Sequence, residues 1–365
     1  MKKTLIALAA LASIGSAFAQ ATITPYARID LGVGATTVTG TPDAGLTAVN
    51  GGYNTSTIGF KGESDIGGGS KAFAKAEIGF GPAGGTGWAN NSWGRTGIVG
   101  VSGGFGAIQL GMDWSPYDNA FNEAMDYNHF SAIGAAWGGG IHNDNGNDAA
   151  NSGAAVGHVQ YTTPTVGGFN AVIMYAPSKD TTTGNSTSYT SAGVNYSAGP
   201  LAISAAMETV PTSNSFGSNA KAGYVKSDGT VVAPVAATLG ASAGDGNNTT
   251  ATVITIAYNL GVATVYGAFQ STKANGVLAG TGSATDTGSA IGVKVPAGPV
   301  ELSLGWAGEK TSGDLESTRS AYAAQVLYPL GKQAKAYFGY RSSKDDASGT
   351  EITTNKYVGG LTMSF

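Results

Sequence analysis

The sequence of 365 residues has no cysteine, three histidines and few charged side chains. Without cysteine no disulfide can form, which suits a chain that must cross an oxidising compartment unfolded without making wrong crosslinks. Charged residues make up 12% of the chain, and this is roughly half the share that is usual in water-soluble globular proteins. The formal net charge is −4, and this mild acidity argues against a nucleic-acid partner.

Long hydrophobic runs are also missing. The apolar stretch 5–14 has about half of the ~20 residues that a membrane-spanning helix needs, and no later stretch approaches that length. It follows two lysines and precedes the small-x-small pattern Ala17-Phe18-Ala19, an arrangement that is typical of a secretory signal peptide. We therefore expect a cleaved signal peptide at 1–19 and one exported domain at 20–365, without a helical span.

Glycine and aromatic residues, in contrast, are abundant, with 58 Gly, 16 Tyr, 12 Phe and 5 Trp. A disordered low-complexity chain would not carry so many aromatic side chains. The mean hydropathy is +0.01, as expected where hydrophobic residues alternate with small polar ones along strands that have two opposite faces. In the last nine residues, positions 357, 359, 361, 363 and 365 are apolar or glycine, and positions 360, 362 and 364 are small or polar. This period of two predicts a strand with one apolar face that runs to Phe365.

Segments with similar alternation recur along the chain and are separated by turn signals. We expect about sixteen strands, at 22–34, 53–63, 71–80, 92–101, 107–113, 155–162, 169–176, 190–197, 201–209, 250–259, 262–272, 287–295, 300–308, 319–328, 335–342 and 356–365. Short links alternate with long ones rich in Gly, Asn, Ser and Thr, and the longest link, 211–248, is expected outside the cell. The even count and the alternating links predict an all-β fold, a transmembrane antiparallel β-barrel of about 16 strands.

A soluble β-sandwich or a β-helix would also contain short alternating strands. Neither of these folds explains the export signal, the number of strands and the terminal aromatic residue together. The barrel is therefore the predicted architecture.

One motif gives a family resemblance. The segment Gly59-Phe60-Lys61-Gly62-Glu63-Ser64-Asp65-Ile66-Gly67-Gly68-Gly69 resembles the second strand and turn of the trimeric general diffusion porins of neisserial and related Gram-negative bacteria. Further similar segments are 25–30, 99–103, 105–111, 161–169 and 357–365. The resemblance covers most of the chain, while the outer loops match nothing. It implies a water-filled outer-membrane channel for passive diffusion of ions and small hydrophilic solutes, with no cofactor and no bound metal.

The resemblance also implies partners. Members of this family form homotrimers, lie among outer-membrane lipid and lipopolysaccharide, and are inserted by the barrel assembly machinery. In such proteins the closing aromatic residue helps this machinery to recognise its client. We therefore expect Tyr357 and Phe365 to act as an assembly signal.

In this family the pore is narrowed by the third loop, which folds inward against the barrel wall. Here that loop is expected at 113–154, and its first half contains Asp113, Asp118, Glu123 and Asp126 without Lys or Arg. Carboxylates in a narrow path create a negative potential. The alternative is a solvated surface loop in which the acids are incidental.

A basic wall is expected opposite the acidic loop. Arg28 and Arg95 match two positions of the basic ladder that general porins carry. Lys61 lies in the family motif, and Lys75 shares one face of its strand with Glu77, opposite a row of small apolar residues. A Lys or Arg on the lipid face at mid-membrane would cost ~2–4 kcal/mol, so these charges are expected to face the lumen.

Three positive charges that relatives often carry are absent, which bears on ion selectivity. Thr57 and Met112 occupy two positions where Arg is common in the family, and a third position falls near Ala154, with His158 as the closest basic candidate. These positive charges are absent while the loop acids remain, and charge in the constriction acts on ions over about one Debye length, ~8–10 Å. We therefore expect a near-neutral to weakly cation-selective pore.

Two other functions remain open at this point. The barrel could be a substrate-specific channel, or a structural or adhesive barrel that works through its outer loops. An enzyme is not expected, because the three histidines suggest no Ser/His/Asp arrangement. The segment 143–148 faintly resembles a calcium loop but lacks the terminal acidic ligand, so it is interpreted as a polar turn.

Overall fold

The computed structural model describes residues 22–43, 45–83, 95–124, 154–177, 188–211, 224–225, 231–232, 248–278, 281–313, 316–347 and 350–365. The expected signal peptide at 1–19, Asp126 and the segment 143–148 lie outside these residues. The same holds for most of the third loop after residue 124.

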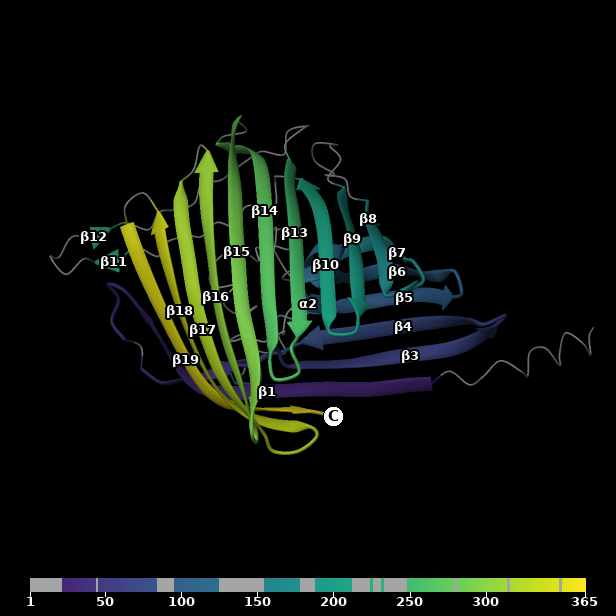
Figure 1. Ribbon diagram of the computed structural model, residues 1–365, viewed down its shortest axis with the longest axis horizontal. Helices are drawn as coiled ribbons and strands as arrows, with labels where there is room; N and C mark the ends of the chain where they lie inside the picture. The colour runs from purple at the N-terminus through teal and green to yellow at the C-terminus, as the bar shows by residue number, and fades with distance from the viewer. Residues whose placement is uncertain are drawn as a thin grey trace, which may run out of the picture.

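A single antiparallel sheet of 17 strands forms a closed wall, made of the short strand β2 (Thr47–Asn50) and sixteen long strands (Figure 1). The long strands are β1 (Thr22–Val38), β3 (Thr57–Gly67), β4 (Ser70–Gly79), β5 (Thr96–Gly103), β6 (Gly106–Trp114), β7 (Ala154–Thr162), β8 (Phe169–Ala176), β9 (Tyr189–Ala198), β10 (Leu201–Pro211), β13 (Asn248–Asn259), β14 (Thr264–Leu278), β15 (Thr281–Ala297), β16 (Val300–Gly313), β17 (Ser317–Pro329), β18 (Ala334–Ala347) and β19 (Thr350–Ser364). Each pairs with its neighbour in the chain, and β1 pairs with β19 to close the barrel. The predicted 16-stranded barrel is confirmed. A separate hairpin is formed by β11 (Tyr224–Val225) and β12 (Val231–Val232).

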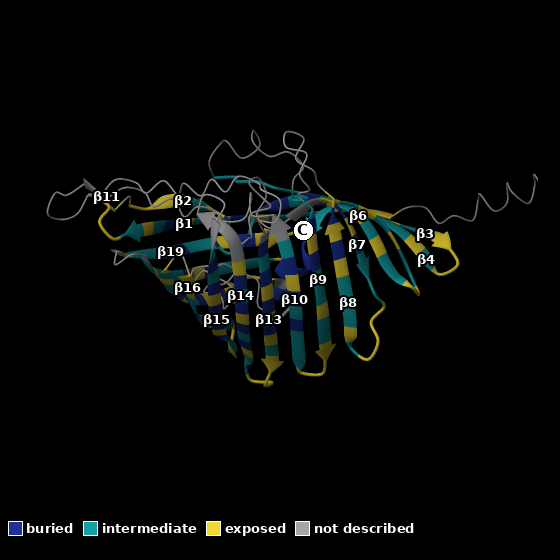
Figure 2. Ribbon diagram, turned by 90° about the horizontal axis from the view of Figure 1, so that it is seen from above, coloured by how far each residue is buried: buried dark blue, intermediate teal, exposed yellow. Residues whose placement is uncertain are grey.

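The strands present alternate residues to the two sides of the wall, which Figure 2 shows as alternating dark blue and yellow bands along β13. On β19 the side chains of Leu361, Met363 and Phe365 are exposed on the outer face. The N–H and C=O groups of Phe365 pair with Ala27 of β1 at 3.0 and 2.8 Å, so the closing residue is fixed in the seam. The predicted apolar outer face of the last strand is confirmed.

Several strands in the second half of the barrel are longer than predicted. The segment 273–286 was expected to be an outer loop, but β14 and β15 continue through it and leave only 279–280 between them. This segment has three Gly among its 14 residues, which suggested a loop by composition, although it also contains two Thr. Thr is β-branched and favours a strand once a partner strand is available, so tertiary pairing overrides the local signal.

The third loop begins with helix α2 (Pro116–Ala124), which lies inside the barrel against β9, β10 and β13. Ser115 caps the helix: its Oγ accepts a hydrogen bond from the Asp118 N–H at 3.1 Å and donates one to the Asp118 carboxylate at 3.0 Å. Pro116 follows at the first helical position, where its missing N–H costs nothing. Among the described residues, no helix has both the length and the apolar character needed to cross a membrane.

Helix α2 is held by packing. Tyr117 and Phe121 are fully buried and meet edge to face, with 5.7 Å between their ring centroids. The wall beneath them is built from small residues of the inward register, namely Ala206, Ala251, Ala268, Ala290, Ala307 and Ala323. These alanines leave room for a helix inside the barrel, and the predicted inward fold of the third loop is confirmed.

A buried polar network ties the closing seam together. The Tyr337 hydroxyl of β18 reaches across β19 and donates to Asp30 Oδ1 of β1 at 2.7 Å. Asp30 is fully buried and also accepts from the Asn54 N–H at 2.8 Å. Tyr337 can cross β19 because Gly360 has no side chain, since a Cβ there would lie 2.5 Å from both the Tyr337 hydroxyl and the Leu31 carbonyl oxygen.

Candidate functional site

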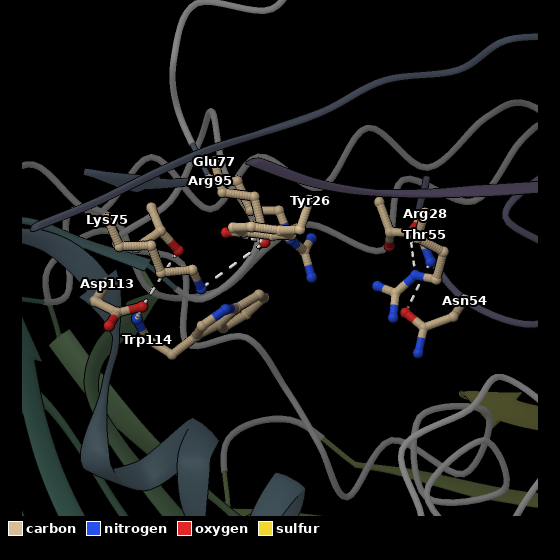
Figure 3. Close-up of polar contacts among 10 residues, drawn as sticks. Tyr26, Arg28, Asn54, Thr55, Lys75, Glu77, Arg95, Asp113 and Trp114 are labelled. Carbon is tan, nitrogen blue, oxygen red and sulfur yellow. Dashed lines mark hydrogen bonds and ion pairs between the residues drawn. The ribbon is translucent and has the colours of Figure 1, made fainter. Parts of the chain in front are cut away.

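A charged cluster lies on the inner wall formed by β1, β3, β4 and β5, with Glu77 of β4 at its centre (Figure 3). The Arg95 Nε atom lies 2.7 Å from Glu77 Oε1, and the Lys75 Nζ atom lies 3.8 Å from Glu77 Oε2. The Tyr26 hydroxyl of β1 donates to Glu77 Oε2 at 2.9 Å. One carboxylate therefore interacts with two cations and a hydroxyl group, which come from β4, from the residue before β5 and from β1.

The acidic end of β6 adjoins this cluster. Asp113 Oδ1 accepts a hydrogen bond from the Thr96 hydroxyl at 3.3 Å and from the Trp114 N–H at 3.0 Å. The Arg95 guanidinium lies over the Trp114 ring, 5.3 Å from its centroid, a cation–π geometry that fixes the side chain further. The first acid of the third loop thus lies beside the basic wall, and not across the lumen from it.

The other two predicted basic residues share this wall. Arg28 Nε donates to the Thr55 carbonyl oxygen at 2.9 Å (Figure 3). Lys61 of β3 stands directly opposite Lys75 of β4 in the register, and its side chain is exposed. All four predicted basic residues, Arg28, Lys61, Lys75 and Arg95, are therefore on one face of neighbouring strands.

The acids of α2 have a different environment. Asp118 is 4% exposed and bonded to Ser115, whose hydroxyl also lies 3.1 Å from Glu208 Oε2 on β10. Burial and the nearby Glu208 and Asp118 carboxylates raise the pKa of Tyr117 well above its usual 10.0, so its hydroxyl stays neutral. Asp118 therefore faces the wall beneath α2 and not the water of the lumen. Glu123 lies in the last turn of the helix.

Sequence reasoning also missed basic residues on the inner register, among them a directly facing pair. Arg341 of β18 and Lys356 of β19 are directly opposite each other, on the same face as Tyr337 and Val358. The strand alternation could have revealed them, since both lie an even number of residues from these buried side chains. Glu77 was placed on the lumen face, but its contacts with Arg95 and Lys75 were not foreseen.

The three positions without the expected Arg differ in their placement. Thr57 is buried on the inner face, between Arg28 and Gly79 in the register. His158 is inward and 1% exposed, with its Nε2 atom 3.5 Å from Gln109 Nε2. Met112 pairs with Gly97, on the outer register that includes Phe60 and Ala76. The idea that Met112 replaces a lumen charge is therefore wrong, because Met112 follows the same alternation along β6 as Ile108 and Leu110 and lies on their outer register.

Comparison with known proteins agrees with this architecture. A model of the Gram-negative porin family matches residues 4–348. The chain is 32% identical over 285 residues to outer membrane porin protein 32 of Delftia acidovorans, covering 75% of this chain and 70% of that protein. It is 36% identical over 206 residues to the major outer membrane protein P.IB of Neisseria gonorrhoeae, covering 54% of this chain and 53% of that protein.

Solved structures show the same fold. An anion-selective porin from Comamonas acidovorans has a TM-score of 0.74 at 22% identity, covering 95% of this chain and all of that chain (100%). The outer membrane protein OmpT of Vibrio cholerae, solved in a trimer form, has a TM-score of 0.66 at 14% identity, covering 94% and 99% of the two chains. The closed barrel, the inward third loop and the family match over most of the chain together show that this chain belongs to the Gram-negative porin family, and that it is a diffusion channel of the outer membrane.

Proposed function

We propose that this porin is a general channel with a near-neutral to weakly cation-selective constriction. The observation that carries this proposal is the position of Glu77, whose carboxylate lies 2.7 Å from Arg95 and 3.8 Å from Lys75. The negative charge of Glu77 therefore offsets part of the positive charge on the same wall, independently of the acids of the third loop. Asp113 adds a further negative charge beside Arg95. Passing ions experience the sum of these charges, because low-dielectric walls focus the field in a narrow path.

Arg341 and Lys356 add two positive charges to the inner wall and so oppose a preference for cations. They are the reason for proposing a near-neutral pore and not a strongly cation-selective one. Small hydrophilic solutes and ions are the proposed cargo. A substrate-specific channel is the second candidate, and concentration-dependent block of the current by one solute would favour it. We propose no enzymatic activity and no role as a plugged adhesive barrel, since the relatives that the chain matches are named as porins.

Single-channel recording in a planar bilayer tests the proposal. In a potassium chloride gradient, the reversal potential should lie near zero or shift modestly towards the potassium equilibrium potential. A strong shift towards the chloride equilibrium potential would contradict it, whereas the absence of discrete conductance steps would favour the plugged barrel.

We also propose a homotrimer in which strands near the two termini face the threefold axis. The outer face of β4 carries Ala72, Ala74 and Ala76, and such small side chains allow close approach of neighbouring barrels. OmpT of Vibrio cholerae has been solved in a trimer form. A native mass measurement after mild extraction should give three times the chain mass, and a single species near 36.3 kDa or less would count against the trimer.

Export and assembly are proposed to follow the usual route for such barrels. The segment 1–19 would be removed after secretion, and the barrel assembly machinery would insert the chain among outer-membrane lipid and lipopolysaccharide. Tyr357 and Phe365 are the proposed assembly signal, and both are on the outer register of β19. Deleting Phe365 should reduce heat-modifiable protein in the outer membrane, while the conductance of molecules that do insert stays unchanged. Wild-type amounts of inserted protein would exclude the role of Phe365.

A further inference from the structure

A second polar cluster lies on the inner wall beneath α2, away from the charged constriction. Its members occupy neighbouring inward positions on three strands: Gln270 and Thr272 on β14, Asp286 on β15 and Glu309 on β16. Thr272 is directly opposite Asp286, and Gly288 stands between Gln270 and Glu309 in the register. Opposite residues in a sheet have Cβ atoms about 4.5–5.5 Å apart, and diagonal neighbours are about 7–8 Å apart. The four side chains therefore face one small space, which Gly288 leaves clear of a side chain.

Three of these side chains carry a buried oxygen that has no hydrogen-bond partner among the described residues: Gln270 Oε1, Asp286 Oδ1 and Glu309 Oε2. Gln270 is fully buried and Asp286 is 2% exposed. The Gln270 amide nitrogen donates to the Thr272 hydroxyl, which leaves the carbonyl oxygen as its unpaired atom. All three atoms are acceptors. A buried acceptor without a donor costs about 1–3 kcal/mol, and more when it is charged.

Helix α2 closes this cluster from the lumen side. The hydroxyl of Tyr117 lies beside Thr272 and within electrostatic reach of Glu309. Tyr117 is fully buried, so its side chain covers this part of the wall and keeps it from the water of the lumen.

The charges around this space do not balance. Asp286 and Glu309 are close enough for their negative charges to repel. Arg319 of β17 is opposite Glu309 in the register, but its guanidinium Nη2 lies 3.3 Å from Asp345 Oδ2. With all three carboxyl groups ionised, three carboxylates and one guanidinium give −3 + 1 = −2. Buried negative charge that is not fully compensated is costly, and a bound cation is one way to relieve that cost.

We propose that this cluster binds a divalent cation of the calcium type, held between β14, β15 and β16 beneath α2. The ligands are the carboxylates of Asp286 and Glu309 and the carbonyl oxygen of Gln270, with the Thr272 hydroxyl beside them. Calcium accepts carboxylate, amide carbonyl and water oxygens at about 2.3–2.6 Å in flexible geometry, whereas magnesium demands a near-ideal octahedron. Within the described residues no three His, Asp or Glu side chains are placed to hold a metal, so the site depends on two carboxylates completed by neutral oxygens.

The cation would neutralise the wall directly below the constriction helix. It therefore links the position of α2, and with it the width of the pore, to the calcium concentration outside the cell. This inference is independent of the proposed ion selectivity, since it concerns a site away from Glu77 and Arg95.

Calorimetric titration of chelator-washed, detergent-solubilised porin with calcium chloride tests the site. Wild-type protein should bind one calcium ion per chain with a Kd of about 10⁻³ M or tighter, the range of extracellular calcium modules. Glu309→Gln and Asp286→Asn should each weaken this binding by roughly tenfold or more. Glu63→Gln, which changes an exposed carboxylate on β3 away from this cluster, should stay within about twofold of the wild type. Gln270→Leu supplies a further ligand variant that retains the volume and both carboxylates, in case a charge variant fails to fold.

Thermal unfolding gives a second readout. Calcium should raise the midpoint of wild-type protein and of Glu63→Gln, because a ligand that binds the folded state stabilises it. Glu309→Gln should lose this response. Equal calcium affinity in wild type and Glu309→Gln would overturn the proposal. So would the lack of any calcium effect on wild type at about 10 mM, roughly tenfold above the weakest expected Kd.

Discussion

Two walls of the same barrel differ in what they present to the interior. The wall of β1, β3, β4 and β5 carries long charged side chains, and Lys75 and Arg95 both pair with Glu77 at the lumen surface. The wall from β10 to β17 instead carries alanine at many inward positions, and α2 lies against β10 and β13 of this wall. One wall provides the electrostatics of the pore, and the other provides a hydrophobic core that holds the constriction helix.

This difference teaches how a porin can narrow its channel without losing its shape. A loop inside a water-filled barrel needs an apolar face to bury, and Tyr117 and Phe121 provide that face against the alanine wall. Because α2 is anchored on this side, the charged wall can remain hydrated and carry paired ions. Stability and ion recognition are therefore assigned to opposite sides of the lumen.

The largest effect is expected from disrupting the packing of α2 against the alanine wall. Replacing the fully buried Phe121 with alanine should destabilise the packing of α2 by about 3–5 kcal/mol, as for other buried Phe→Ala changes. The helix should then leave the wall part of the time, so single-channel recordings should show a larger and noisier conductance. The matched control is Phe269→Ala on β14, whose side chain is 53% exposed on the outer face of the barrel. Unchanged conductance in Phe121→Ala would show that α2 does not depend on this core.

An intermediate effect is expected at the seam, which borders the charged wall. Tyr337→Phe removes the 2.7 Å hydrogen bond to the buried Asp30 carboxylate. Hydrogen bonds to charged groups contribute about 1.5–3 kcal/mol, so the thermal midpoint of the barrel should fall. The control is Tyr340→Phe, which removes a 3.0 Å hydrogen bond to the amide oxygen of Asn355 and should cost only about 0.5–1.5 kcal/mol. Equal losses in both variants would mean that the seam network has no special role.

The smallest energetic effect, with the most specific readout, is expected on the charged wall. Glu77→Gln should shift the reversal potential towards anions, and Arg95→Ala should shift it towards cations. One unit charge at ~8 Å in water changes the energy of a passing ion by about 0.5 kcal/mol, or roughly twofold in the permeability of that ion. Thr57→Arg adds a charge next to Arg28 and should act in the anion direction. Reversal potentials in the opposite order would refute the proposed role of Glu77.

Most of the barrel could be predicted from the sequence because a strand with one lipid face and one lumen face has a strict period of two. Phe365, Met363 and Leu361 lie on the outer face of β19 as this period requires. Lys75 and Glu77 likewise lie on the inner face. The same period places Met112 on the outer face with Ile108 and Leu110, and the expectation of a lumen position for Met112 came from the family resemblance instead.

The environment of individual charges was harder to predict. Asp118 belongs to an acidic loop by sequence, but its side chain accepts a hydrogen bond from the capping Ser115 and is buried against the wall. The pattern Ser115-Pro116-Tyr117-Asp118 is a capping box at the start of a helix, and this signal was available. The contacts of Glu77 with Arg95 and Lys75, in contrast, depend on the register of neighbouring strands, which a sequence fixes only through long-range pairing.

The passage of Tyr337 across the seam has a consequence for mutational tolerance. At Gly360 any side chain would meet the Leu31 carbonyl oxygen at 2.5 Å, so substitutions there should be rejected in every genetic background. At Gly52 a Cβ would meet only side-chain atoms within that distance, the Tyr337 hydroxyl and Val358 Cγ1, each at 2.5 Å. Gly52 should therefore accept alanine once Tyr337 and Val358 are made smaller. In a saturation library, Gly360 would show unconditional constraint and Gly52 would show epistasis with two residues more than 280 positions away along the chain.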